Sequence, residues 1–246
     1  MRIKTHLKQQ CYSSLLALSL VTACITAQAQ PLALAQSLES PKLPLTVIDK
    51  QRASVLKLEN NYGPYDIRLK EAFKGLGFQL KNSGDFFEAR NAYNRALHIS
   101  RVNEGLYNVS QVSIVERLIE LDFRLANWTD MNNHYGYLEN LYKRLYRVDD
   151  PKLEEGLKKV VAWHIDASNI NLDGNKIEHL RKVHTLFKLR LQVAELTLAG
   201  EDPMFDFLKQ NIARSERYLY LASDLNKEMM RQRKRSLRDR YIVSRD

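Results

Sequence analysis

Hydrophobic, small and polar residues recur at helical spacing through most of the chain beyond residue 47, most regularly between residues 68 and 101. Apolar positions three or four residues apart are typical of amphipathic helices. The segment NSGD, residues 82–85, interrupts this period with turn-forming residues. The pattern therefore predicts two helices joined by a turn. Eight positions carry it: Phe73, Leu76, Gly77, Leu80, Gly84, Ala89, Tyr93 and Ala96.

These eight positions resemble the tetratricopeptide repeat (TPR), a helix–turn–helix unit of about 34 residues in which small residues let two antiparallel helices pack closely. The resemblance covers roughly residues 55–165, with its clearest repeat at 70–103, and Arg101 replaces the final proline of the motif. It implies an all-α fold, an α-solenoid of TPR-like hairpins. It also implies a non-catalytic scaffold whose groove holds a peptide or protein.

Two weaker hairpins follow the first. Asp122 falls where Leu80 stands in the first repeat, so we expect the first helix of the second repeat to be degenerate or to slip by one residue. A third hairpin at 152–199 shows the helical period without the small TPR residues. Shifted by 42 residues, the pattern recurs in a degenerate repeat at 112–145 through Leu118, Ala126, Met131, Tyr135 and Leu138.

The C-terminal part predicts one long capping helix from residue 203, which would close a helical domain spanning residues 48–224. Stacked repeats need a terminal element to cover their open end; pairing with another helix is the alternative. The apolar stripe of this helix contains Leu208, Ile212, Ser215, Leu219, Ala222, Asn226 and Met229.

Residues 1–29 have the three zones of a secretory signal peptide: a basic head, an apolar run and small residues at Ala27 and Ala29. The apolar run is shorter than the roughly 20 residues that span a bilayer. We expect cleavage after Ala29. Residues 30–47 hold three of the six prolines and predict a flexible spacer.

The segment Val21-Thr22-Ala23-Cys24 resembles a bacterial lipobox, which implies lipidation of Cys24. Cleavage after Ala29 and lipidation at Cys24 remain alternatives. The first gives a periplasmic protein. The second gives a membrane-anchored structural lipoprotein that assists outer-membrane or peptidoglycan machinery. Both cysteines, Cys11 and Cys24, precede residue 30, so the predicted mature body has no disulfide or thiolate site.

The formal charge of +9 is concentrated at the C-terminus, where residues 225–246 hold eight Lys or Arg and three Asp or Glu. Each basic residue close to an anionic membrane contributes about 1 kcal/mol of binding. The tail is therefore expected either to contact an anionic membrane surface or to be a solvated helix end; export makes nucleic acid an unexpected partner. Its central basic residues are Arg231, Arg233, Lys234, Arg235, Arg238 and Arg240.

Catalytic motifs are missing from the sequence: it has no GxSxG, HExxH, Walker-type or dinucleotide-binding pattern. We therefore expect no enzyme, cofactor or metal site. His179 and His184 are five residues apart and diverge on a helix, and Glu116 and Glu120 would form only an exposed carboxylate pair. Three further histidines are predicted to be isolated: His98, His134 and His164.

The TPR resemblance also implies where a peptide would bind. TPR families that clamp a C-terminal carboxylate supply Lys, Asn and Arg from the first helix of each repeat. Here the corresponding candidates are Lys74, Phe78 and Lys81, with Phe78 in place of the expected asparagine. A solvated helix face is the alternative. The aromatic residues Tyr135, Tyr142 and Tyr146 lie near one helical face and are expected in the core.

Overall fold

The computed structural model describes residues 45–243, without the side chains of residues 45–46, 173, 225–226 and 236–243. The predicted signal peptide, Cys24 and most of the spacer lie outside the described residues. The described residues form helices joined by short connections and contain no strand. The helices are α2 (Leu45–Tyr62), α3 (Arg68–Asn82), α4 (Phe86–Glu104), α5 (Ser110–Arg124), α6 (Trp128–Leu145), α7 (Pro151–Asn169), α8 (Lys176–Thr197), α9 (Pro203–Ala222) and α10 (Asp224–Val243), with a 3-10 turn, η1 (Leu172–Gly174), between α7 and α8.

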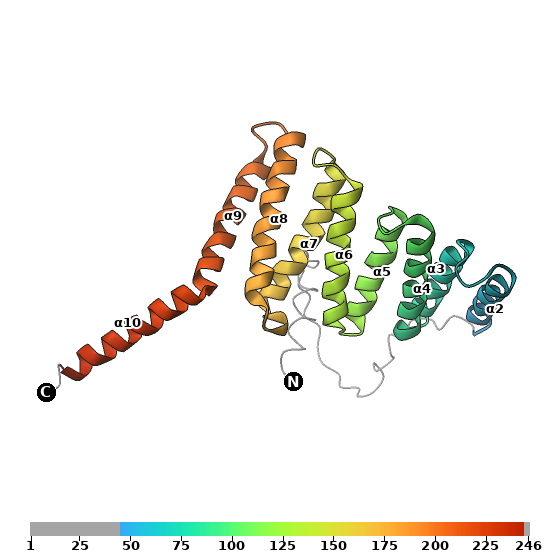
Figure 1. The fold of residues 1–246 in the computed structure, drawn as a ribbon, viewed down its shortest axis with the longest axis horizontal. Coiled ribbons are helices and arrows are strands. Elements are labelled where there is room, and N and C mark those ends of the chain that lie inside the picture. The colour runs from blue at the N-terminus through green and yellow to red at the C-terminus, as the bar shows by residue number, and fades with distance from the viewer. Residues whose placement is uncertain (1–44, 244–246) are drawn as a thin grey trace, which may run out of the picture. The chain divides into compact units, whose positions relative to one another are not determined.

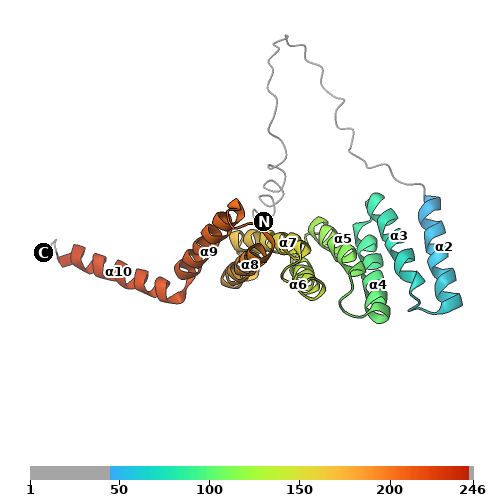
Figure 2. The ribbon, with the colours of Figure 1, turned by 90° about the horizontal axis from the view of Figure 1, so that it is seen from above.

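Each helix packs against the next one in the chain, as Figure 1 shows. Seen from above in Figure 2, α3, α5 and α7 form one row and α4, α6 and α8 form a second row beside it. Packing in sequence order is typical of repeat proteins, in which each unit contacts mainly its neighbours. The predicted all-α, solenoid-like fold is confirmed.

The first hairpin is closest at Gly77. A Cβ atom placed on Gly77 would lie 2.8 Å from the ring of Tyr93 and 3.3 Å from the carbonyl oxygen of Ala89. Tyr93 and Ala89 are both buried, so neither can move aside easily. The predicted contact of the two helices at Gly77 and Ala89 is therefore confirmed, and its cause is the missing side chain.

The turn that follows α3 recurs 42 residues later. Gly84 has φ +85°, and the flanking N–H groups of residues 83–85 donate to the carbonyls of residues 79–81. Ala126 has φ +54°, with the same three hydrogen bonds made by residues 125–127. A left-handed residue with such bonds is a common helix C-terminus. The repeat detected in the sequence is thus a repeat of backbone geometry.

Of the two alternatives for the second repeat, the slip by one residue is wrong and the degenerate position remains. The carbonyl of Asp122 accepts from the N–H of Asn127, just as the carbonyl of Leu80 accepts from the N–H of Asp85, so the register is kept. Asp122 is 0% exposed, and its carboxylate accepts from Arg90 Nε and His134 Nδ1, each at 2.6 Å. A buried carboxylate is tolerated here because both oxygens are paired.

Two features of the helices differ from the sequence expectation. α2 begins at Leu45, so the last three residues of the predicted spacer are helical. The predicted long capping helix is two helices, because Ser223 has ψ 151° and ends α9. The Ser223 hydroxyl donates to the carbonyl of Tyr220 at 2.7 Å, a local bond that competes with helix continuation. α10 then leads away beyond α9 in Figure 1.

The tyrosines of α6 behave largely as expected. Tyr142 is buried, and its ring would collide with a Cβ on Gly156 of α7. Tyr135 is half-buried and stacks on Trp163 with ring centroids 5.0 Å apart. Tyr146 is half-buried beside Tyr142. These rings hold α6 to α7, so they are packing residues.

Candidate functional site

The predicted groove residues of α3 are largely committed to other contacts. Lys74 Nζ donates to Glu71 at 2.9 Å, and Lys81 Nζ donates to Glu120 of α5 at 3.1 Å. Phe78 lies between them in the sequence and is 46% exposed. Because each lysine already has a carboxylate partner, this face offers an aromatic side chain and little free positive charge.

The carboxylates Glu116 and Glu120 are structural ion-pair partners. Glu116 accepts from Lys159 of α7 at 2.7 Å, and Glu120 accepts from both Lys81 and Arg117. Burial raises the pKa of Glu120, but hydrogen bonds from Arg117 and Lys81 outweigh it and leave that pKa below its usual value. These pairs link α3 to α5 and α5 to α7. Glu120 is thus held ionised, which does not suit a general acid.

A pocket of about 620 Å³ lies between α7, α8 and α9. This volume falls in the range of about 300–1,000 Å³ that is usual for ligand sites. Among the described residues, the lining contains two cations and no carboxylate. The lining consists of Ile165, Ser168, Asn169, Lys176, Leu180, Val183, Phe187, Asn211, Arg214, Ser215, Tyr218, Leu221 and Ala222.

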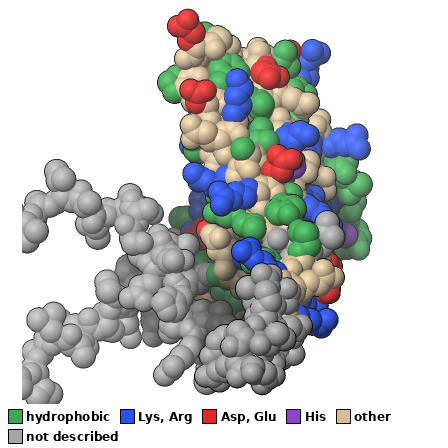
Figure 3. Space-filling model, turned by 90° about the vertical axis from the view of Figure 1, so that its left-hand side faces the viewer, with side chains coloured by type: hydrophobic (Ala, Val, Ile, Leu, Met, Phe, Trp, Pro, Cys, Tyr) green, Lys and Arg blue, Asp and Glu red, His purple; other side chains and the backbone are tan. Residues whose placement is uncertain are grey.

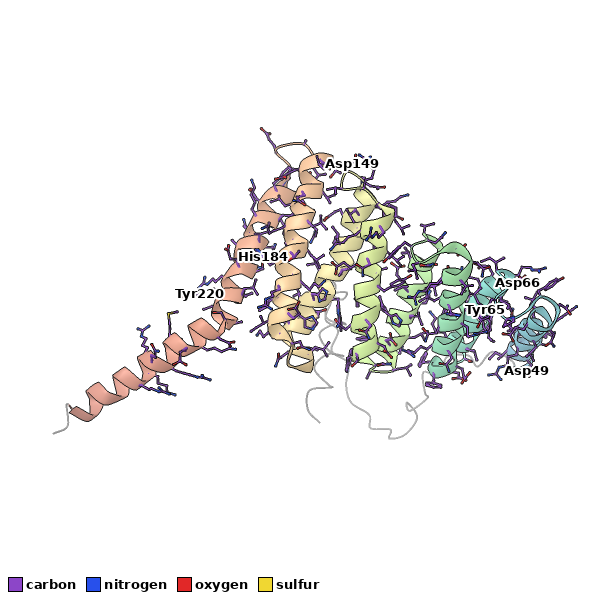
Figure 4. The ribbon with its side chains drawn as sticks, in the orientation of Figure 1. Asp49, Tyr65, Asp66, Asp149, His184 and Tyr220 are labelled. Carbon is purple, nitrogen blue, oxygen red and sulfur yellow. The ribbon has the colours of Figure 1, made fainter. Side chains whose placement is uncertain are left out.

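The pocket is bordered by α9, which packs along α8 but buries few of its own side chains. Among the described side chains of α9, Leu208 and Ser215 are the buried ones. Farther along the helix, Tyr218 and Leu221 are about half exposed. His184 of α8 lies beside α9 in Figure 4, and its Nδ1 is 3.0 Å from Ser215 Oγ. Leu208 and the partly buried Phe205 and Ile212 pack against the core, while the C-terminal half of α9, including Ser215, borders the pocket.

The two cations of the pocket are uncompensated. Within the part of the chain that the structure describes, the side chains of Lys176 and Arg214 form neither an ion pair nor a hydrogen bond, and both residues are exposed. In the sequence these residues were not distinguishable from other surface cations. Only the packing of α9 against α7 and α8 brings them to one apolar pocket.

The expectation that His164 is isolated is wrong. Its Nδ1 lies 2.9 Å from Nδ1 of His179, and both imidazoles are buried. Burial, followed by the neighbouring His179, lowers the pKa of His164 to about 4. His134 is not isolated either, because it bonds Asp122. His98 is exposed, with its ring tilted against Tyr65; Figure 4 shows Tyr65 and Asp66 in the connection before α3.

The histidine pair replaces the glycine–alanine contact of the first hairpin. His164 lies five residues before the end of α7, as Gly77 does in α3. His179 lies three residues after the start of α8, as Ala89 does in α4. The sequence could show this correspondence only if the helix ends were known, because it depends on the distance of each residue from a helix end. In the third hairpin two hydrogen-bonded rings separate the helices at the point where the first hairpin has a close backbone contact.

The basic residues of α10 are exposed as far as they are described. Arg231, Arg233, Lys234 and Arg235 lie at the surface with Met229 and Met230, while the side chains of Arg238 and Arg240 lie outside the described part. Arg231 is 3.6 Å from Glu228. Figure 3 views the molecule from the side of α9 and α10 and shows hydrophobic side chains next to Lys and Arg side chains.

Two further features bear on the site. Among the side chains that the structure describes, no cluster of three or more His, Cys, Asp or Glu residues could hold a metal ion. None of the described helices combines the length and the apolar character needed to cross a bilayer.

No protein-family model matches the sequence, and a search of curated proteins finds no relative.

Proposed function

We propose that this chain is a non-catalytic scaffold of the bacterial cell envelope, an exported TPR-like α-solenoid that binds a protein or peptide partner. The observation that carries the proposal is the pocket between α7, α8 and α9, which combines apolar walls with Lys176 and Arg214, two cations that have no partner among the described side chains. Concave, mostly apolar sites with a few polar groups are the usual ligand sites of proteins. The 42-residue repetition of the turn at Gly84 and Ala126 supports the TPR-like part of the proposal.

The contact between His184 and Ser215 is better explained by packing than by catalysis. A serine nucleophile needs an accessible hydroxyl and N–H donors for the oxyanion. Ser215 is 3% exposed, lies within α9 and donates to the carbonyl of Ile212 at 2.7 Å. The N–H groups around a residue inside a helix are used by the helix itself. The pair therefore fastens α9 to α8.

The pocket is a better partner site than the predicted groove. Lys74 and Lys81 of the groove have carboxylate partners, whereas Lys176 and Arg214 of the pocket have none among the described residues. A ligand at the groove would have to displace existing ion pairs. Phe78 remains as a second contact surface on the same scaffold.

Photo-crosslinking in the cell tests the proposal. A photoreactive phenylalanine analogue placed at Tyr218 reports on the pocket, and one at Phe78 reports on the groove. Phe87 of α4 is 61% exposed, lines neither surface and serves as the control position. We expect a discrete crosslinked partner from Tyr218 and not from Phe87. If neither Tyr218 nor Phe78 yields a product that Phe87 lacks, the scaffold proposal is wrong.

The lipoprotein alternative depends on the segment that ends at Cys24. An acylated Cys24 would anchor the scaffold to a membrane, and the basic α10 would add attraction to an anionic membrane surface. The mass of the mature N-terminal peptide separates the two alternatives. A diacylglyceryl cysteine supports the anchor, whereas an unmodified terminus at Gln30 supports a free periplasmic protein.

A further inference from the structure

We infer that the pocket between α7, α8 and α9 binds an acidic segment of the partner protein that also carries large apolar side chains. The inference rests on the proposed scaffold function and names the chemistry of its ligand. It follows from three observations: the charge of the pocket, its apolar wall and the exposed side chains outside its lining.

The charge of the pocket is the first reason. Several basic side chains between helices have carboxylate partners, as in the pairs Lys70–Glu104 and Arg90–Asp122. Lys176 and Arg214 share one pocket without such a partner among the described residues. Ligand carboxylates would supply charge-assisted hydrogen bonds to both cations.

The position of Lys176 adds a second reason for an anion. Lys176 is the first residue of α8, a helix of 22 residues, and so its charge lies at the positive end of the helix dipole. A lysine is unfavourable there by itself. A carboxylate bound at this point would interact favourably with both the ammonium group and the dipole, since helix N-termini are suited to anions.

The apolar wall selects a ligand with large apolar groups. Leu180, Val183 and Phe187 of α8 are each 4% exposed and form a packed floor. Tyr218 and Leu221 of α9 line the same pocket and are about half exposed. A ligand side chain packed against Tyr218 and Leu221 would remove their exposed apolar surface from water, which favours binding.

The surroundings of the pocket favour a protein segment over a fatty acid. Outside the pocket lining, Tyr220 near the end of α9 and Met229 and Arg231 of α10 are also exposed. Figure 4 shows Tyr220 on α9 close to the start of α10. A single carboxylate on one acyl chain would use the pocket alone. A peptide with several acidic and apolar residues is long enough to contact the pocket and these exposed side chains as well.

Selection from a library of random 12-residue peptides, displayed on phage, tests this inference with the purified full-length protein. The charge-reversed variant is Lys176→Glu/Arg214→Glu. The matched control is Lys188→Glu/Lys209→Glu, which makes the same charge change on α8 and α9 at exposed residues outside the pocket lining. We expect the wild type and the control to enrich peptides that combine Asp or Glu with Phe, Leu or Tyr. The charge-reversed variant should enrich Lys- or Arg-containing peptides instead.

Fluorescence anisotropy with the most enriched acidic peptide then measures the effect. Its Kd should rise at least tenfold for the charge-reversed variant and stay within twofold for the control. Circular dichroism checks that each variant is folded, and Lys176→Gln/Arg214→Gln replaces the reversed variant if the reversed one is not. The inference would be overturned if the wild type and the charge-reversed variant selected the same peptides, or if no peptide were enriched. It would also be overturned if the protein bound dodecanoate saturably and bound no peptide.

This result is separable from the scaffold proposal itself. A partner crosslinked at Tyr218 that is still crosslinked in the charge-reversed variant would keep the scaffold and overturn the acidic ligand. Loss of crosslinking in the reversed variant, but not in the Lys188→Glu/Lys209→Glu control, would support both.

Discussion

His164 and His179 share a hydrogen bond of 2.9 Å between their Nδ1 atoms inside the third hairpin. One ring must donate and the other must accept, so at least one imidazole is neutral. Both lie at the point where α7 crosses α8, at the positions that Gly77 and Ala89 hold in the first hairpin. A neutral, buried pair of this kind makes folding sensitive to acid.

The pH dependence follows from the depressed pKa of His164. Its pKa is about 4 in the folded protein, against 6.5 for an ordinary histidine. Burial is the main cause, the neighbouring His179 and Lys182 lower the pKa further, and Glu139 opposes them. Between these two values the unfolded chain binds more protons, so the free energy of unfolding falls as the pH drops from 6.5 towards 4. We expect a loss of up to about 3 kcal/mol from this group.

Urea unfolding at pH 7.5 and pH 5 measures the effect. Replacement of the exposed His98 by Gln should leave the pH dependence unchanged, and His164→Leu should reduce it. If the free energy of unfolding changed with pH equally in the wild type and in His164→Leu, His164 would not be the group responsible.

Gly77→Ala should destabilise the protein by about 1–3 kcal/mol, because the added methyl group overpacks the contact with Tyr93 and Ala89. Gly75→Ala in the same helix is the matched control, since its nearest neighbour would be Gln51 at 3.8 Å. That change should stabilise the helix by about 0.5–1 kcal/mol. Opposite signs in urea unfolding are the expected result, and equal signs would disprove the close contact at Gly77.

Asp122→Ala should cost about 1–3 kcal/mol, because it leaves hydrogen-bond donors of Arg90 and His134 without their buried acceptor. Arg90 would retain Asp130 at 2.6 Å, whereas His134 would lose the partner that it has in Asp122. Asp149→Ala is the control, because Asp149 pairs with Arg147 at an exposed site. Exposed pairs contribute about 0–1 kcal/mol. Urea unfolding measures the loss of unfolding free energy in both variants. Similar losses would contradict a stabilising role for the buried Asp122.

Leu208→Ala should loosen α9 more than any other part of the chain. Leu208 is 0% exposed and is one of the two buried side chains described in α9, so its truncation should cost about 2–5 kcal/mol at that site. Hydrogen exchange should accelerate in residues 203–222 and remain slow in α3 and α4. Leu221→Ala, at a half-exposed residue, should leave the exchange of α9 unchanged. Equal acceleration in α3 would show that α9 does not open independently.

Much of the fold could be predicted because its signals are local. The period of apolar residues gave the helices, and the small residues Gly77 and Ala89 located the contact of α3 with α4. Asp150 and Pro151 marked the start of α7, where the Asp150 carboxylate accepts from the N–H of Lys152. The helix break at Ser223 was not predicted, because the apolar stripe from Leu208 to Met229 continues through it and serine is tolerated inside helices.

By itself, the sequence determined which segments are helical, where the hairpins turn and which small residues let them close, since these depend on neighbours within a few positions. Only the tertiary structure decided that Asp122 is paired by Arg90, that His164 meets His179, and that Lys176 and Arg214 share one pocket. These relationships join residues on different helices. Each depends on how far one helix lies from the next, and that distance is set by side-chain packing across the whole stack.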